Sequence, residues 1–193
     1  MAPGPLIIVS GPAGAGKSSL IAALLADAPW PLRLSISVTT RQPRPGERDG
    51  VAYRFWTREA FEAELKRGGF LEWADVFGNY YGTLRQEVEP QRAQGTGVLL
   101  EIDVQGCEQV KKLHPEALSI FIRTSSLETY EERLRRRGAD SEASIRRRVA
   151  GARVELARAV HYDYHVINDD FEQALTELRR IVGSAFAGVS RPE

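Results

Sequence analysis

The sequence has little cysteine, no excess charge and no long apolar run, and each absence excludes a class of protein. Cys107 is the single cysteine, so an internal disulfide framework is excluded and a reducing compartment is favoured. The 26 basic and 26 acidic side chains cancel, so overall charge indicates neither a nucleic-acid nor a membrane partner. The first apolar run, 6–9, is far shorter than the roughly 20 residues of a membrane span. We therefore expect a cytoplasmic protein without a signal peptide or membrane helix.

The chain of 193 residues is long enough for one compact domain with a sizeable core. Short apolar runs alternate with helical patterns, which predicts an α/β fold with a mainly parallel sheet flanked by helices. Strands are expected at 6–9, 35–38, 98–102, 118–122 and 164–167. Helices are expected at 17–25, 57–67, 84–94, 125–137, 141–159 and 171–186. Ser125 and Glu128 form a possible capping box for the fourth helix, and Gly138 is expected to end it.

Two polar, arginine-rich segments interrupt this alternation, at about 37–95 and 123–159. The first contains the loop 39–50, where Pro43, Pro45 and Gly46 disfavour regular structure. We interpret both segments as insertions over one edge of the sheet, where ligands bind in such folds.

A glycine-rich turn after the first expected strand matches the phosphate-binding pattern G-x-x-x-x-G-K-[ST]; it reads GPAGAGKS over residues 11–18. Glycines let the backbone curl so that its N–H groups point at phosphate oxygens, and the following helix presents its N-terminus to the same anion. Lys17 would contact the β- and γ-phosphates, and the Ser18 hydroxyl would bind Mg²⁺. A chance glycine turn is the alternative, but the preceding strand and following helix favour a phosphate cradle.

A candidate magnesium-binding carboxylate follows the strand expected at 98–102. Asp103 ends this apolar run, and either Asp103 or Glu101 could hold Mg²⁺ through water. Many buried strands end in aspartate only because a turn follows, so this pattern alone does not decide the matter.

The phosphate cradle is shared by kinases, GTPases and motor ATPases. The chain lacks the Asn-Lys-x-Asp guanine motif of GTP-binding switches, because 168–170 reads Asn-Asp-Asp. Eight arginines lie between Arg133 and Arg153, opposed there only by Asp140 and Glu142. A solvated helix face or a nucleic-acid contact would also explain this charge. Phosphoryl transfer needs such cations, so we expect some of these arginines to close over ATP as a lid.

The first insertion has the features of an acceptor site. Arg41 and Arg44 lie three residues apart in a proline-stiffened loop, which suits a clamp for a substrate phosphate. An exposed basic loop is the alternative. Together with the cradle, the loop favours a kinase with a small phosphorylated acceptor.

Six segments resemble the guanylate kinase family over nearly the whole chain. In order they read GPAGAGKSSL, SVTTRQPRPGE, FLEWADVFGNYYGT, EIDVQG, RRGADSEASIRRR and VINDD. The resemblance implies one kinase domain over 1–193, which transfers the γ-phosphoryl group of ATP to GMP with Mg²⁺. It implies a core at about 1–36, 96–124 and 160–193, a GMP-binding region at about 37–95 and a helical lid at about 125–159.

The resemblance also implies roles for individual residues. ATP would be bound by Gly11, Pro12, Ala13, Gly14, Ala15, Gly16, Lys17, Ser18, Ser19 and Asn168, the last beside the adenine. The GMP phosphate would be held by Arg41, Arg44, Tyr53 and Tyr81. The guanine would be recognised by Ser37, Glu72 and Thr83, with Asp103 near the guanine edge or the Mg²⁺ shell. The catalytic set would be Lys17, Arg41, Arg137 and Arg148.

The chemistry of guanine supports this assignment independently. A carboxylate such as Glu72 accepts the N1–H and N2–H donors together, and the hydroxyls of Ser37 and Thr83 can donate to O6. Adenine lacks the N1–H and would leave the carboxylate unpaired. The chain departs from the usual family pattern at Ala13 and Thr83, where serine is common, and at Glu101, where aspartate is common. Thr83 keeps the hydroxyl that guanine recognition needs.

Three other functions stay open at this point. Guanylate-kinase-like domains also serve as peptide-binding scaffolds, although such domains tend to lose cradle or lid residues that this chain keeps. A related kinase for a phosphorylated sugar would retain the cradle but have no use for Glu72. A nucleic-acid binder would show salt-sensitive binding and no turnover. The sequence does not predict an oligomeric state.

Overall fold

The computed structural model describes residues 2–136 and 141–187, and the chain divides into two compact units. The first unit comprises Met1–Leu6 and Pro31–Ala117, and the second comprises Ile7–Trp30 and Leu118–Glu193. Both units are therefore assembled from separate stretches of sequence. Within the described residues, no helix is long and apolar enough to cross a membrane.

The second unit contains three parallel strands, in the order β1-β8-β9. They are β1 (Leu6–Ser10), β8 (Leu118–Arg123) and β9 (Tyr164–Ile167). All five residues of β1 are buried, as are the four central residues of β8. Such continuous buried runs in β1 and β8 are typical of parallel strands covered on both faces. The strand bounds and the parallel pairing confirm all three strands expected here.

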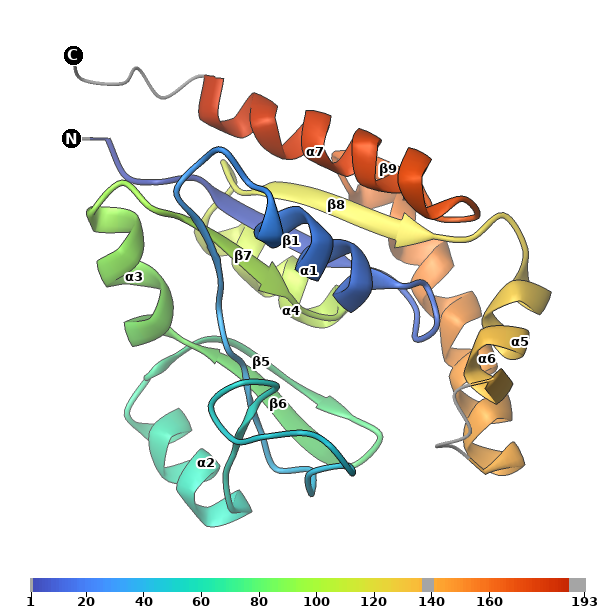
Figure 1. Cartoon of the computed structure of the whole chain (residues 1–193). Helices are drawn as coiled ribbons and strands as arrows, with labels where there is room; N and C mark the ends of the chain where they lie inside the picture. The colour runs from blue at the N-terminus through green and yellow to red at the C-terminus, as the bar shows by residue number, and fades with distance from the viewer. Residues whose placement is uncertain (1, 137–140, 188–193) are drawn as a thin grey trace. The chain divides into compact units, whose positions relative to one another are not determined.

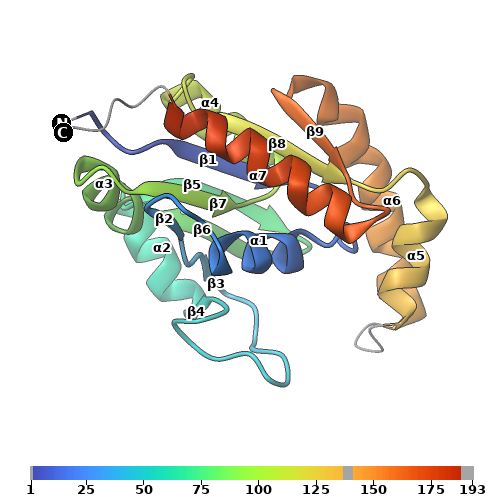
Figure 2. The same ribbon diagram turned by 45° about the horizontal axis from the view of Figure 1, so that its top comes forward.

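Helices of the second unit flank these strands (Figures 1 and 2). They are α1 (Lys17–Ala26), α5 (Leu127–Arg136), α6 (Glu142–Arg158), the short 3₁₀ helix η1 (Ala159–His161) and α7 (Phe171–Ala187). Helix α1 packs against α7, and α5 packs against α6. The expected capping box at Ser125 and Glu128 is wrong by one residue. Ser126 accepts the Thr129 N–H instead, because α5 begins at Leu127 and Ser126 is the residue that precedes it. The Ser125 N–H donates to Asp169.

The first unit contains a parallel pair of strands and a separate four-stranded sheet. The pair consists of β2 (Leu32–Leu34) and β7 (Gly97–Glu101). The sheet has the order β4-β3-β6-β5, from β4 (Arg54–Phe55), β3 (Val38–Thr39), β6 (Asn79–Leu84) and β5 (Phe70–Val76). Residues 70–84 carried no strand prediction, although they form the antiparallel hairpin β5–β6.

The strand expected at 35–38 is wrong, because the chain changes partners there. The Ser35 N–H still donates to the Leu99 carbonyl of β7, whereas the Ser37 carbonyl already accepts the Arg54 N–H. Strand β2 therefore ends before Ser35, and β3 begins at Val38 in the other sheet.

Three helices complete the first unit: α2 (Arg58–Lys66), α3 (Arg85–Ala93) and α4 (Val104–Leu113). The Thr57 side chain caps α2, as the helix expected at 57–67 implies. Phe61 of α2 stacks on Phe70 of β5 with ring centres 4.2 Å apart, within a buried cluster that also contains Val38 and Leu84. Helix α4, which the sequence did not predict, packs against β5. Gly106, in the first turn of α4, lies against the side chain of Glu72.

Candidate active site

The glycine-rich turn has the backbone of a phosphate cradle. Gly11, Gly14 and Gly16 all have positive φ angles, of 144°, 91° and 87°. A side chain at Gly11 would place its Cβ 2.0 Å from the Ile122 carbonyl oxygen of β8. The turn thus needs glycine both for its conformation and for its close approach to the strands. It leads directly into α1, whose N-terminus attracts anions.

Lys17 curls back over this turn. Its Nζ donates to the Gly11 carbonyl at 2.5 Å and to the Pro12 carbonyl at 3.2 Å. The ammonium group is therefore held at the mouth of the cradle by neutral dipoles, which a phosphate can replace with a full negative charge. Ser18 and Ser19 follow in the first turn of α1, and both are exposed.

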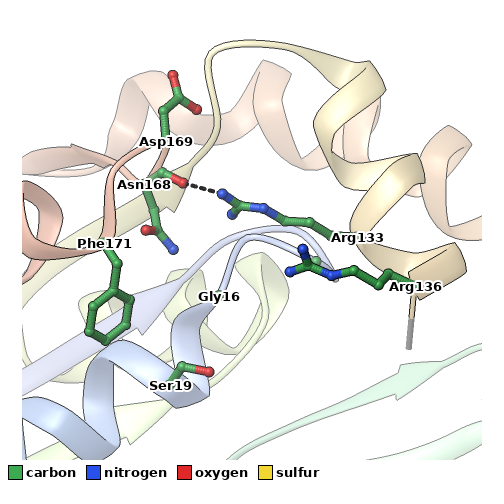
Figure 3. A pocket seen from close by; sticks show the side chains of 8 residues that line it. Gly16, Ser19, Arg133, Arg136, Asn168, Asp169 and Phe171 are labelled. Atoms are coloured by element: carbon green, nitrogen blue, oxygen red, sulfur yellow. Dashed lines mark hydrogen bonds between the residues drawn. The ribbon is translucent and has the colours of Figure 1, made fainter. Parts of the chain in front are cut away.

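A cavity of about 350 Å³ opens beside the cradle, entirely within the second unit. Figure 3 shows Arg133 and Arg136 of α5 extending toward the glycine-rich turn. The walls of the cavity are Gly14, Gly16, Ser19, Arg133, Arg136, Asn168, Asp169 and Phe171. Two cations, backbone N–H groups and an aromatic ring are the groups expected around a nucleotide.

Asn168 ties the cradle to the helix α5. Its side-chain amide donates to the Ala15 carbonyl at 2.7 Å. Its backbone carbonyl accepts a hydrogen bond from Arg133 at 2.8 Å (Figure 3). Asn168 is only 4% exposed, and a Cβ at Gly16 would lie 2.3 Å from its Nδ2. Its observed contacts therefore fix the shape of the cradle and the place of Arg133.

Of the two lid arginines expected to be catalytic, Arg137 lies outside the described residues. Arg148 is half-buried on α6, where its Nε donates to the Ser144 hydroxyl at 3.4 Å. Arg133 and Arg136 belong to the arginine-rich segment, but the sequence did not predict them as site residues. Their signal was a helical spacing of three, which turns both toward one face.

Three of the four residues expected at the GMP phosphate lie close together in the first unit. They are Arg41 of the loop 39–50, which we call the acceptor loop, and the nearby Tyr53 and Tyr81. Arg41 Nε donates to the Tyr81 hydroxyl at 3.2 Å, and the Arg41 guanidinium lies 5.5 Å from the centre of the Tyr53 ring. Burial and the nearby Glu101 charge raise the pKa of Tyr53 to about 12, so its hydroxyl stays protonated and can donate to a phosphate. Arg44 is exposed.

Glu47 holds the fork of Arg41 in this structure. Two hydrogen bonds of 3.0 Å join the guanidinium to the two carboxylate oxygens, and Glu47 also accepts the Arg44 N–H at 2.8 Å. Burial opposes ionisation of Arg41, but the bonds to Glu47 and Tyr81 outweigh it and raise the pKa of Arg41. Glu47 ends the segment SVTTRQPRPGE, but the sequence predicted no role for it.

Glu72 and Thr83, the residues expected to recognise guanine, are in direct contact. Both are buried, and the Thr83 hydroxyl donates to Glu72 Oε1 at 2.6 Å. A bulge in β5 at Leu71 shifts the register, since Phe70 pairs with Leu84 whereas Glu72 pairs with Thr83. Bulges of this kind re-aim a side chain next to a site. Ser37, the third expected residue, is half-buried.

The environment of Glu72 disfavours its charge. Burial raises the pKa of this carboxyl to about 7; hydrogen bonds from Thr83 oppose the shift, and the charge of Asp103 adds to it. Asp103 caps α4, where its carboxylate accepts the Gly106 N–H at 2.8 Å and the Gln105 side chain at 3.1 Å. Two carboxylates thus lie at one helix N-terminus, an arrangement suited to a ligand that presents several N–H donors.

Comparison with known proteins identifies the family of this chain. A sequence model described as guanylate kinase matches residues 4–185. The chain is 51% identical to the guanylate kinase of Shewanella violacea over 94% of its own length and 87% of that protein, and 53% identical to that of Hahella chejuensis over 94% and 86%. The crystal structure of guanylate kinase from Anaplasma phagocytophilum superposes with a TM-score of 0.76 at 31% identity, covering 95% of this chain and 87% of that one. A match of this extent, over both the phosphate cradle and the acceptor loop, shows that the chain belongs to the guanylate kinase family.

Proposed function

We propose that this nucleoside monophosphate kinase transfers the γ-phosphoryl group of ATP to GMP, giving ADP and GDP, with ATP bound by the second unit and GMP by the first. The contact between Glu72 and Thr83 carries the choice of acceptor. It offers a carboxylate and a hydroxyl in a site that is only 4% exposed at Glu72. Arg41 with Tyr53 and Tyr81 then holds the acceptor phosphate, and Arg44 and Ser37 complete the contacts to GMP.

On the ATP side, Lys17 and the backbone of residues 11–19 would hold the phosphates, and Arg148 with Arg137 would reach them from the lid at about 125–159. Asn168 would border the adenine. The acceptor oxygen is largely ionised at pH 7, given a second phosphate pKa of about 6, so no general base is needed. Catalysis then consists of alignment and charge neutralisation, with water excluded as the lid closes.

Mg²⁺ fits this site as a companion of ATP. The exposed hydroxyl of Ser18 is a hard oxygen ligand in the first turn of α1, and Mg²⁺ usually keeps several waters and binds substrate phosphates. The described residues contain no group of three or more His, Cys, Asp or Glu side chains placed to hold a metal. Ser18 would therefore supply the direct protein contact, and Asp103 or Glu101 would act through water. The ion would neutralise charge on the β- and γ-phosphates.

The proposed reaction is tested by an assay of ADP release with Mg-ATP and each of GMP, AMP, CMP and UMP. Turnover with GMP far above the other three is the expected result. Equal turnover with all four would contradict the guanine-recognition role of Glu72. Activity only with a phosphorylated sugar would show that the acceptor is not a nucleoside monophosphate. We also propose a cytoplasmic location, because a chain with a single cysteine, Cys107, forms no internal disulfide and has no need of an oxidising compartment.

Replacing Arg41 with alanine is expected to raise the KM for GMP by about 10- to 100-fold, because a charge-assisted hydrogen bond contributes roughly 1.5–3 kcal/mol. The KM for ATP should stay within about twofold. Steady-state kinetics with each substrate varied in turn would measure both. Arg67→Ala is the control, since Arg67 lies in the same unit but its side chain is 70% exposed. An Arg41→Ala enzyme with an altered KM for ATP alone would contradict the assignment.

GMP binding should strengthen as the pH rises to about 7 and then level off. Burial raises the pKa of Glu72 to about 7, so the free enzyme holds a proton there at lower pH. Only the ionised carboxylate accepts two guanine donors, so binding below pH 7 must release this proton and weakens by up to about tenfold per pH unit. Calorimetric titration with GMP at pH 6, 7 and 8, in buffers of different ionisation enthalpy, measures both affinity and proton release.

The phosphate of GMP also titrates, near pH 6, and contributes its own pH dependence. Glu72→Gln removes the carboxyl but not the phosphate, so it isolates the protein's share. We expect the proton release centred near pH 7 to disappear in this variant. The same release in parent and variant would show that Glu72 does not titrate on binding.

A further inference from the structure

Gly106 occupies a helical position that does not require glycine for its backbone. It is the third residue of α4, and it is not one of the glycines whose φ angle is positive. Alanine favours a helix over glycine by about 1 kcal/mol, so the intrinsic preference at this position is for a side chain. A reason for glycine must therefore come from its surroundings.

The surroundings leave no room for a side chain. A Cβ built on Gly106 would lie 2.3 Å from Glu72 Oε2 and 3.0 Å from Glu72 Cδ. Carbon and oxygen atoms that are not bonded do not approach so closely, so either the helix or the carboxyl group would have to move. The Glu72 carboxylate occupies the space that a side chain at position 106 would need.

Neither partner can move without losing a contact. The Gly106 N–H is bonded to the capping carboxylate of Asp103 at 2.8 Å, which fixes the first turn of α4. On the other side, Glu72 is held by the Thr83 hydroxyl at 2.6 Å and by its place in the bulged strand β5. A methyl group at position 106 would therefore turn the carboxylate away from Thr83 and change its direction.

We propose that Gly106 is a positioning residue for guanine recognition: it keeps free the space that allows Glu72 to accept both guanine donors while bonded to Thr83. The proposal rests on the function proposed for Glu72 above. It predicts that specificity for the guanine base depends on a residue with no side chain of its own.

The test is Gly106→Ala, assayed with GMP and with inosine monophosphate, which keeps the N1–H but lacks the 2-amino group. A correctly oriented carboxylate binds GMP more tightly, because it also accepts a hydrogen bond from the 2-amino group. The ratio of kcat/KM for GMP to that for inosine monophosphate therefore measures the orientation of the carboxylate. We expect this ratio to fall by about 10-fold or more, since small misplacements in a site have effects up to 10²-fold. The KM for ATP should change by less than about twofold. An unchanged ratio would overturn the proposal.

Gly183→Ala is a matched control for general destabilisation. Gly183 lies inside α7 of the second unit, where an added Cβ would meet the Trp30 ring at 2.6 Å. This variant should lower Tm while leaving the base ratio unchanged. A fall of the ratio in both variants would show that loss of stability, not the aim of Glu72, causes the effect.

Glu72→Gln separates failure of this proposal from failure of the function. If Glu72→Gln does not alter the base ratio, the guanine role of Glu72 itself is wrong. If Glu72→Gln lowers the ratio and Gly106→Ala does not, only the positioning role is wrong. Combining the two substitutions should add little beyond Glu72→Gln alone, because both remove the same interaction.

A second pair of variants keeps the test valid if Gly106→Ala does not fold. Glu72→Asp shortens the side chain by one methylene and withdraws the carboxylate from the space at Gly106. Adding Gly106→Ala to Glu72→Asp should then leave the base ratio unchanged and should raise Tm slightly, because alanine is the better helix former. A further loss of stability in the double variant would show that the methyl group collides with something other than the Glu72 carboxylate.

Discussion

Replacing Lys17 with alanine is expected to lower kcat by about 10²- to 10³-fold, the effect of removing one well-placed group that stabilises charge in a transition state. The substitution should leave the KM for GMP nearly unchanged, because Lys17 and the GMP-binding residues lie in different units. Assay of ADP release at saturating Mg-ATP and GMP measures kcat directly. Parent-like turnover would contradict the assignment of residues 11–18 as the phosphate cradle.

The physical reason lies in the contacts that Lys17 makes in this structure. Its ammonium is bonded to the Gly11 and Pro12 carbonyls of its own turn, so it needs no other part of the protein to place it. Alanine removes the charge but keeps a good helix former at the start of α1, so Tm should change little. Lys17→Arg should not restore activity, since a planar fork differs in shape from a compact ammonium. Lys112→Ala, at an exposed position of α4, is the control.

The second large effect is expected for Glu72→Gln, which should lower kcat/KM for GMP by about 10²- to 10⁴-fold. Sites that use hydrogen bonds to recognise a group discriminate to this extent when the pairing is lost. Glutamine keeps the size of the side chain and can still accept from Thr83, but its amide N–H₂ would face the donors of guanine. The KM for ATP should remain close to that of the parent.

Preference for GMP over AMP should narrow in the same variant, since the loss falls on the guanine pairing alone. Kinetics with both acceptors at several concentrations would measure this ratio. Glu89→Gln controls for the change in charge, because Glu89 lies in the same unit on α3 and its side chain is 56% exposed. An undiminished preference for GMP in Glu72→Gln would show that another group reads the base.

The features that the sequence predicted well are those whose cause is local. The order of glycines, lysine and serine at 11–18 predicted the backbone of the cradle, whereas the contact from Asn168 that fixes its shape leaves no local pattern. The strand β9 and the helix α7 follow from an apolar run and a 3.6-residue period, and both were predicted within one residue.

The features that were missed depend on parts of the chain far apart in sequence. The hairpin β5–β6 turns at Phe77 and Gly78, where Phe77 has a φ of 54°, and this pair is not one of the usual turn signals. Helix α4 contains Gly106, which weakens its helical pattern and is explained only by Glu72, 34 positions earlier. Likewise, the bond from Arg133 to the Asn168 carbonyl requires knowledge of tertiary packing.

The bond between Asn168 and the Ala15 carbonyl joins residues 153 positions apart, and it has a consequence for synthesis on the ribosome. The phosphate cradle therefore leaves the exit tunnel about 150 residues before the amide that closes it. A nascent chain that does not yet include residue 168 cannot form this bond, so its nucleotide pocket is incomplete even if other parts have folded. During translation, the complete nucleotide pocket therefore forms only after the whole first unit, which ends at Ala117, has emerged.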